Sequence, residues 1–114
     1  MRITDLLASD GYILCNKALL HEFGINETLL LGELAQEYNY WDNRKQLENG
    51  WFYSTVENVE KATALSAYQQ REALRTLVDK KVIEVERRGL PAKRYIKLNL
   101  RAILDIFNAS NEET

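Results

Sequence analysis

The sequence predicts a mainly α-helical domain with a small β-hairpin, an α+β fold class. Apolar residues recur at helical spacing over most of the chain, and three consecutive aromatic residues interrupt that pattern at 51–53. Apolar and polar residues alternate on both sides of the Gly-Leu-Pro turn at 89–91, as they do in a hairpin. The chain has 114 residues, the length of one ordinary domain. We therefore expect a single domain over 1–114, with its core at about 12–100 and a disordered tail over 108–114.

Two helices are expected in the first half of the chain. The first follows an extended stretch at 12–15, with Asn16 as its N-cap, and it ends at Gly24. Asn26 can cap the second helix, which is the most hydrophobic and is therefore placed at the centre of the core. The polar run 42–50 that follows predicts a loop.

A short strand and a third helix come next. The aromatic run 51–53 favours a strand. The helix over 56–62 can be capped by Ser54 or Thr55, and Ser54 with Glu57 has the spacing of a capping box.

The second half predicts a helix-turn-helix followed by a hairpin. A tight turn at 63–65 leads into a serine-capped helix over 66–80. The strands 82–88 and 93–99 form the hairpin, and an amphipathic helix starts at Leu100. Two short helices joined by a tight turn, the second leading into a hairpin, are typical of a winged helix-turn-helix. Here it carries extra N- and C-terminal helices.

The charge of the chain is unevenly distributed. The net charge is −2, but residues 71–101 hold ten basic and four acidic side chains. Residues 1–70 hold five basic and ten acidic side chains. A polarised distribution suggests that one face of the domain meets a polyanion.

Several functional classes are not expected from this sequence. No apolar run approaches the roughly 20 residues that span a bilayer, and the N-terminus lacks the layout of a signal peptide. We expect a cytoplasmic protein without a membrane partner. The single Cys15, expected to be buried, and the single His21 cannot form a metal site. No phosphate-binding loop or nucleophile motif occurs. We therefore expect no enzyme, no catalytic residue, no cofactor and no small-molecule substrate.

The helix over 66–80 and the wing over 85–97 predict a surface for double-stranded DNA. The outer side of the helix is polar, and the major groove admits one helix and presents hydrogen-bonding base edges. Gln can pair with adenine, Arg with guanine or a phosphate, and the basic wing can contact the phosphate backbone. The candidate DNA-binding residues are Tyr68, Gln69, Arg71, Arg75, Arg87, Arg88, Lys93 and Arg94.

A second class of function is a protein-interaction or oligomerisation module that does not read DNA. Basic hairpin tips and polar helix faces are often only solvated. The acidic first half, Glu72 on the outer helix face and the aromatic residues Tyr38, Tyr40 and Trp41 favour this alternative. The apolar surface of the N-terminal stretch, the aromatic residues and the last helix also predicts a homodimer or a higher oligomer.

The segment NGWFYSTVENVEKATALSAYQQREALRTLVDKKVIEVERRGLPAKRYIKL resembles a known group of proteins. It is similar to the winged-helix N-terminal domains of phage and plasmid replication proteins of Gram-positive bacteria, the replisome-organiser and DnaD-like families. The features that match are the aromatic strand, the capped helix, the Leu-Ser pair before the recognition helix and the wing, which lie at Trp51–Tyr53, Thr55, Leu65–Ser66 and Gly89–Tyr95.

That resemblance implies a role in replication initiation. It implies binding to origin DNA, self-association and help in loading the replicative helicase, so the helicase or its loader is a possible partner. A winged-helix transcription regulator is the nearest variant of this function.

Overall fold

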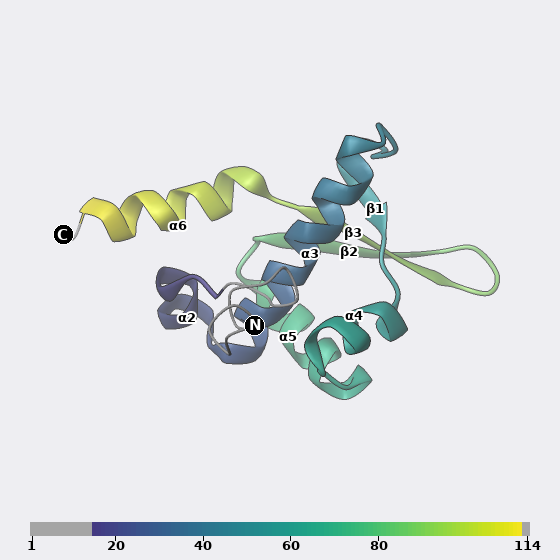
Figure 1. Ribbon diagram of the computed structural model, residues 1–114, viewed down its shortest axis with the longest axis horizontal. Coiled ribbons are helices and arrows are strands. Elements are labelled where there is room, and N and C mark those ends of the chain that lie inside the picture. Colours follow the sequence, from purple (N-terminus) through teal and green to yellow (C-terminus); the bar gives the residue numbers. More distant parts are fainter. Residues whose placement is uncertain (1–14, 113–114) are drawn as a thin grey trace, which may run out of the picture.

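The structure, a computed structural model, describes residues 15–112, with their side chains as far as Ala109. This part of the chain forms five helices and a three-stranded antiparallel sheet. In chain order these are α2 (Lys17–Phe23), α3 (Ile25–Asn43), β1 (Trp51–Tyr53), α4 (Val56–Thr63), α5 (Ala67–Asp79), β2 (Ile83–Arg88), β3 (Lys93–Leu98) and α6 (Leu100–Glu112). The predicted fold class, mainly α with a small β-hairpin, is confirmed, and the arrangement is winged-helix-like (Figure 1).

The first two helices join without a loop. The side chain of Asn16 accepts hydrogen bonds from two backbone N–H groups of the first turn, so it caps α2 as predicted. Gly24 ends α2 with φ 109°, a conformation that glycine adopts without steric cost. It also begins α3, and Thr28 Oγ1 donates to the Gly24 carbonyl at 2.7 Å. The prediction that Asn26 caps this helix is wrong, because Asn26 lies inside its first turn.

Helix α3 lies at the centre of the core, as its composition predicted. Leu30 and Leu34 are fully buried, and α3 packs against α2, α4, α5 and β1. The buried apolar side chains that surround it come from every other element except α6 and include Phe52, Val59, Leu77 and Ile96. Helix α6 packs partly buried side chains against this body and contacts α2, on the side opposite the hairpin loop (Figure 1).

The strand order of the sheet is β1-β3-β2, so β3 is the central strand. Phe52 of β1 and Val85 of β2 both pair with Ile96 of β3. Because side chains alternate along a strand, residues in register with Ile96 and every second position from it share the face turned towards the helices, which we call the inner face. The remaining strand positions form the outer face.

Helix α4 is capped by Thr55, whose Oγ1 accepts from the Asn58 N–H at 3.0 Å. The capping box expected between Ser54 and Glu57 is wrong, because the Ser54 side chain is buried and bonds to the hairpin. Thr55 therefore leaves Ser54 free to take a structural role.

Four residues other than glycine within 15–112 lie in the left-handed region, namely Lys45, Asn49, Ala64 and Lys81, and the last two lie at the ends of helices. Ala64 ends α4 with φ 65°, and Lys81 follows α5 with φ 64°. A Cβ atom makes this conformation unfavourable by about 1 kcal/mol. The Lys81 carbonyl accepts a hydrogen bond from the Asn99 side chain at 3.0 Å, which ties this turn to the start of α6.

The ends of the described chain differ from expectation. Helix α6 continues to Glu112. The disordered tail was expected to begin at residue 108, but residues 108–112 are helical. Cys15 is exposed rather than buried. The rest of the extended stretch expected at 12–15 lies outside the described residues. No helix within 15–112 is long and apolar enough to cross a membrane.

Candidate nucleic-acid interface

A groove of about 340 Å³ lies between α5 and the hairpin. Its lining comes from the starts of α4 and α5, the exposed side of α5 and the inner face of the hairpin, and consists of Val56, Ala67, Arg71, Leu74, Arg75, Val78, Asp79, Val85, Arg87 and Arg94. The predicted residues Arg71, Arg75 and Arg87 are all exposed here. The structure thus brings cations of the helix and of the wing to a single groove.

A second hollow, of about 210 Å³, adjoins this groove at the N-terminus of α4. Arg87 lines both, and Lys93 lines the second one. The Lys93 Nζ lies 5.5 Å from the centre of the Tyr53 ring, within the range of a cation–π contact. Arg71, Arg75 and Arg87 thus share the first groove. Lys93, the register partner of Arg88, belongs to the outer face and borders only the second hollow.

The first turn of α5 is held by a capping box. Ser66 Oγ accepts from the Gln69 N–H at 3.2 Å, and the Gln69 side-chain carbonyl accepts from the Ser66 N–H at 2.9 Å. Bidentate pairing with adenine needs both ends of the amide, so Gln69 in this conformation offers only its NH₂ group. Tyr68 is 62% exposed, and the Arg71 guanidinium lies 5.5 Å from its ring centre. These two side chains extend the exposed surface at the start of α5.

Arg94 is not a surface residue, which corrects its assignment as a phosphate contact. It is only 4% exposed. Its Nε donates to the Ser54 carbonyl at 3.1 Å, its Nη1 to Gln70 Oε1 at 3.2 Å and its Nη2 to Ser54 Oγ at 3.4 Å. The sequence indicates this burial, because Arg94, Ile96 and Leu98 occupy every second position of β3 and so share the inner face.

Arg88 also lies away from the groove, on the outer face of the sheet. Its guanidinium is 4.4 Å from the Tyr95 ring centre and 5.2 Å from that of Trp51. It forms ion pairs with Glu86 at 3.3 Å and with Glu48 at 3.7 Å. The expectation that Arg88 joins the helix in one surface is therefore corrected, because successive strand residues point to opposite faces.

Acidic groups accompany the cations of the interface. Glu72 pairs with Arg75 at 3.1 Å, Asp79 lines the groove, and Glu57 lines the adjoining hollow. Among the ion pairs within residues 15–112, none involves Arg71, Arg87 or Lys93. These three exposed cations are the ones that remain available to an anionic ligand.

The buried arginine connects this interface to the core. Burial lowers the pKa of Arg94, and the positive charge of Arg87 lowers it further, while Glu37 and Glu57 oppose the shift. Gln70 of α5 is fully buried, and its side-chain NH₂ group donates to the carbonyls of Val56 and Leu65. Through Gln70 and Ser54, Arg94 links β3 to α5 and β1, so the wing and the exposed helix are held in a defined relation.

Comparison with known proteins finds a similarity of structure. No family model matches this chain. No curated protein matches it. A solved structure described as the N-terminal domain of a DNA binding protein has a TM-score of 0.60 and 12% identity, covering 98% of this chain and 95% of that chain. At this identity the similarity shows the fold.

Proposed function

We propose that this chain is a domain that binds double-stranded DNA, with α5 in the major groove and the wing over 85–97 on the phosphate backbone. The observation that carries the proposal is the groove in which Arg71, Arg75 and Arg87 meet. Arg71 and Arg75 lie on the exposed side of α5, from which base edges or phosphates are within reach. The solved structure with the same fold, described as part of a DNA binding protein, supports this proposal.

The wing supplies the second half of the contact. The hairpin projects beyond the body of the domain (Figure 1). Leu90 at its tip is fully exposed, between the cations Arg87 and Lys93. An apolar tip flanked by positive charge suits the minor groove, where apolar side chains can wedge between base steps. Each phosphate that the cations neutralise releases counterions and adds affinity that depends on salt.

The resemblance of residues 49–98 to replisome-organiser and DnaD-like domains supports a finer proposal. In that role the domain is not an enzyme but a cytoplasmic DNA-binding part of a replication initiation protein, with the replicative helicase or its loader as a partner. Self-association is proposed with it, because Leu100 and Leu104 of α6 are exposed. Sedimentation that shows only monomer at high micromolar concentration would contradict the oligomer.

The experiment that tests DNA binding is an anisotropy titration with a labelled duplex of about 20 base pairs. Wild-type affinity should fall by orders of magnitude as salt rises from about 50 to 200 mM. The variant Arg71→Ala/Arg87→Ala/Lys93→Ala should bind at least about tenfold more weakly, with a smaller salt slope.

The control is a variant in which exposed arginines on another surface are replaced by alanine. Arg44 and Arg101 are exposed and lie outside the groove and the adjoining hollow. Arg44→Ala/Arg101→Ala should therefore bind DNA almost as the wild type does. If wild-type protein fails to bind at about 50 mM salt, or if the triple variant binds equally well, the protein-interaction alternative replaces this proposal.

A further inference from the structure

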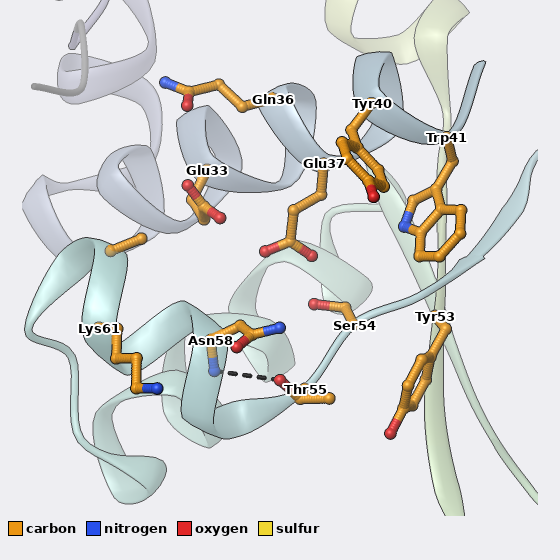
Figure 2. A pocket seen from close by; sticks show the side chains of 11 residues that line it. Glu33, Gln36, Glu37, Tyr40, Trp41, Tyr53, Ser54, Thr55, Asn58 and Lys61 are labelled. Carbon is orange, nitrogen blue, oxygen red and sulfur yellow. Dashed lines mark hydrogen bonds between the residues drawn. The ribbon is translucent and has the colours of Figure 1, made fainter. Parts of the chain in front are cut away.

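A further groove of this domain is separate from the groove beside α5. It has a volume of about 700 Å³ and lies between α3, the end of β1 and α4. Its lining includes two carboxylates and three aromatic rings and consists of Glu33, Gln36, Glu37, Tyr40, Trp41, Tyr53, Ser54, Thr55, Asn58, Lys61 and Ala62. Figure 2 shows the carboxylates of Glu33 and Glu37 directed into the space between α3 and α4.

The two carboxylates of this groove occupy an unfavourable environment. Burial, a hydrogen bond with Glu37 and the negative charge of Glu37 raise the pKa of Glu33 to about 8. Within the described residues, Glu37 Oε2 is buried and has no hydrogen-bond partner. Two carboxylates thus lie one helical turn apart in a partly buried groove, and a positive charge placed between them would stabilise the ionised form of Glu33.

The charged groups around this pair are few. Lys61 of α4 lines the groove, and Arg94 lies beneath Glu37, whose charge acts on the guanidinium. Within residues 15–112, no ion pair joins Lys61 or Arg94 to Glu33 or Glu37. Once Glu33 loses its proton, the two carboxylates and Lys61 leave one negative charge in the lining of the groove, and the charge of Arg94 beneath Glu37 offsets it.

Aromatic rings form one end of the groove, beside the carboxylates (Figure 2). Tyr40 is 49% exposed and meets Trp41 edge to face at 5.1 Å between ring centres. The Arg44 guanidinium already lies 3.6 Å from the centre of the Tyr40 ring. This end of the domain therefore shows, within its own chain, the contact that an arginine makes with an aromatic face.

We propose that this groove is a docking site for a partner protein, and that it receives an arginine side chain from an extended basic segment of that partner. A guanidinium is planar, bonds to carboxylates in a bidentate manner and stacks on aromatic rings. Glu33 and Glu37 supply carboxylates for the hydrogen bonds, and Tyr40, Trp41 and Tyr53 supply aromatic rings for the stacking contact. Phosphate is excluded by the same carboxylates, so the occupant is a polypeptide rather than DNA. This site goes beyond the proposed DNA function; it shares Tyr53, Ser54 and Thr55 with the hollow that adjoins the DNA groove, but Glu33, Glu37, Tyr40 and Trp41 belong to it alone.

A short arginine peptide tests the site directly. The probe is acetyl-Gly-Arg-Gly-amide, titrated to about 20 mM into ¹⁵N-labelled protein and followed by NMR. Saturable shifts are expected at the Trp41 indole N–H and at the amides of 33–41 and 53–58. The lysine analogue should bind several times more weakly, because it lacks the planar fork.

Two double variants distinguish peptide binding in this groove from nonspecific attraction of the peptide to negative charge. Glu33→Gln/Glu37→Gln should lower the affinity for the arginine peptide by at least about tenfold. Glu60→Gln/Glu84→Gln removes two exposed carboxylates that do not line the groove and should bind the peptide as the wild type does. Thermal unfolding of both variants shows that they fold. Duplex DNA binding should survive in Glu33→Gln/Glu37→Gln, so failure of this site and failure of the DNA proposal give different results.

Proton release adds a readout that nonspecific binding does not share. The peptide should bind more tightly as pH rises from about 6 to 8.5, because the guanidinium displaces the proton that Glu33 holds. Calorimetry in two buffers of different ionisation enthalpy should detect that release, and Glu33→Gln should abolish it.

Two results would overturn the proposal. One is the absence of saturable shifts, or equal shifts in Glu33→Gln/Glu37→Gln. The other is self-association of the protein alone that is lost in high salt and in the same variant. That behaviour would assign the groove to the basic wing of a second copy instead of a partner protein.

Discussion

Arg87 and Arg94 are direct partners in the register of the hairpin and point to the same face of the sheet, but only Arg94 is buried. Arg94 belongs to the central strand, where β1 supplies the Ser54 carbonyl and α5 supplies Gln70. Arg87 belongs to the edge strand and opens onto the groove beside α5. Two arginines that look equivalent in sequence therefore divide into a structural group and a candidate ligand-binding group.

The first prediction concerns stability. Arg94→Ala should lower the free energy of unfolding by about 2–4 kcal/mol, because it leaves Gln70 Oε1 and both Ser54 oxygens without their charged donor. Arg87→Ala should change it by about 0.5 kcal/mol or less, as exposed substitutions do. Urea unfolding of both variants measures the difference. If Arg94→Ala lowers the free energy of unfolding as little as Arg87→Ala does, the Arg94 hydrogen bonds do not stabilise the fold.

The second prediction compares two neighbouring residues of the wing. Arg87→Ala should weaken duplex DNA binding severalfold, since this side chain faces the groove shared with α5. Arg88→Ala should change DNA affinity less than about twofold, because Arg88 lies on the outer face and pairs with Glu86 and Glu48. Anisotropy at about 50 mM salt separates the two. The reverse order would place the DNA on the outer face of the sheet.

The third prediction follows from the raised pKa of Glu33, about 8 against an ordinary 4.5. Between these pH values the folded protein holds a proton at Glu33 that the unfolded chain has lost. The contribution of Glu33 to the free energy of unfolding therefore falls as pH rises from about 4.5 to 8.

Glu33→Gln removes this dependence. The variant should gain stability over the wild type progressively from pH 5 to pH 8.5 in chemical denaturation, with little difference at about pH 5. Glu84→Gln, an exposed carboxylate on β2, is the control and should follow the wild type. A constant difference between Glu33→Gln and wild type across this range would show that Glu33 titrates normally.

The fourth prediction concerns the left-handed residues Ala64 and Lys81 at the ends of α4 and α5. Ala64→Gly and Lys81→Gly should each raise the free energy of unfolding by about 0.5–1 kcal/mol, because glycine adopts φ 65° and φ 64° without a Cβ clash. Ala62→Gly, inside α4, should lower it by a similar amount. Thermal unfolding in parallel measures all three. Destabilisation by glycine at 64 or 81 would show that the side chains stabilise these turns.

Much of the local structure was determined by sequence alone. The caps at Asn16 and Ser66, the end of the first helix at Gly24 and the two strands of the hairpin were predicted correctly. These features depend on hydrogen bonds between residues a few positions apart and on the alternation of side chains along a strand. Such information is contained in a short window of residues.

The division of the basic residues was decided by tertiary structure. Arg94 is buried because β1 pairs with β3 across some 40 positions of sequence, and no local pattern states that pairing. The candidate groove at Glu33 and Glu37 has the same origin. Two glutamates one turn apart on the most apolar helix are visible in sequence, but α4 and β1 enclose them only in the folded chain. Burial is a property of distant elements packed together, so the chemistry of these side chains was settled by the fold.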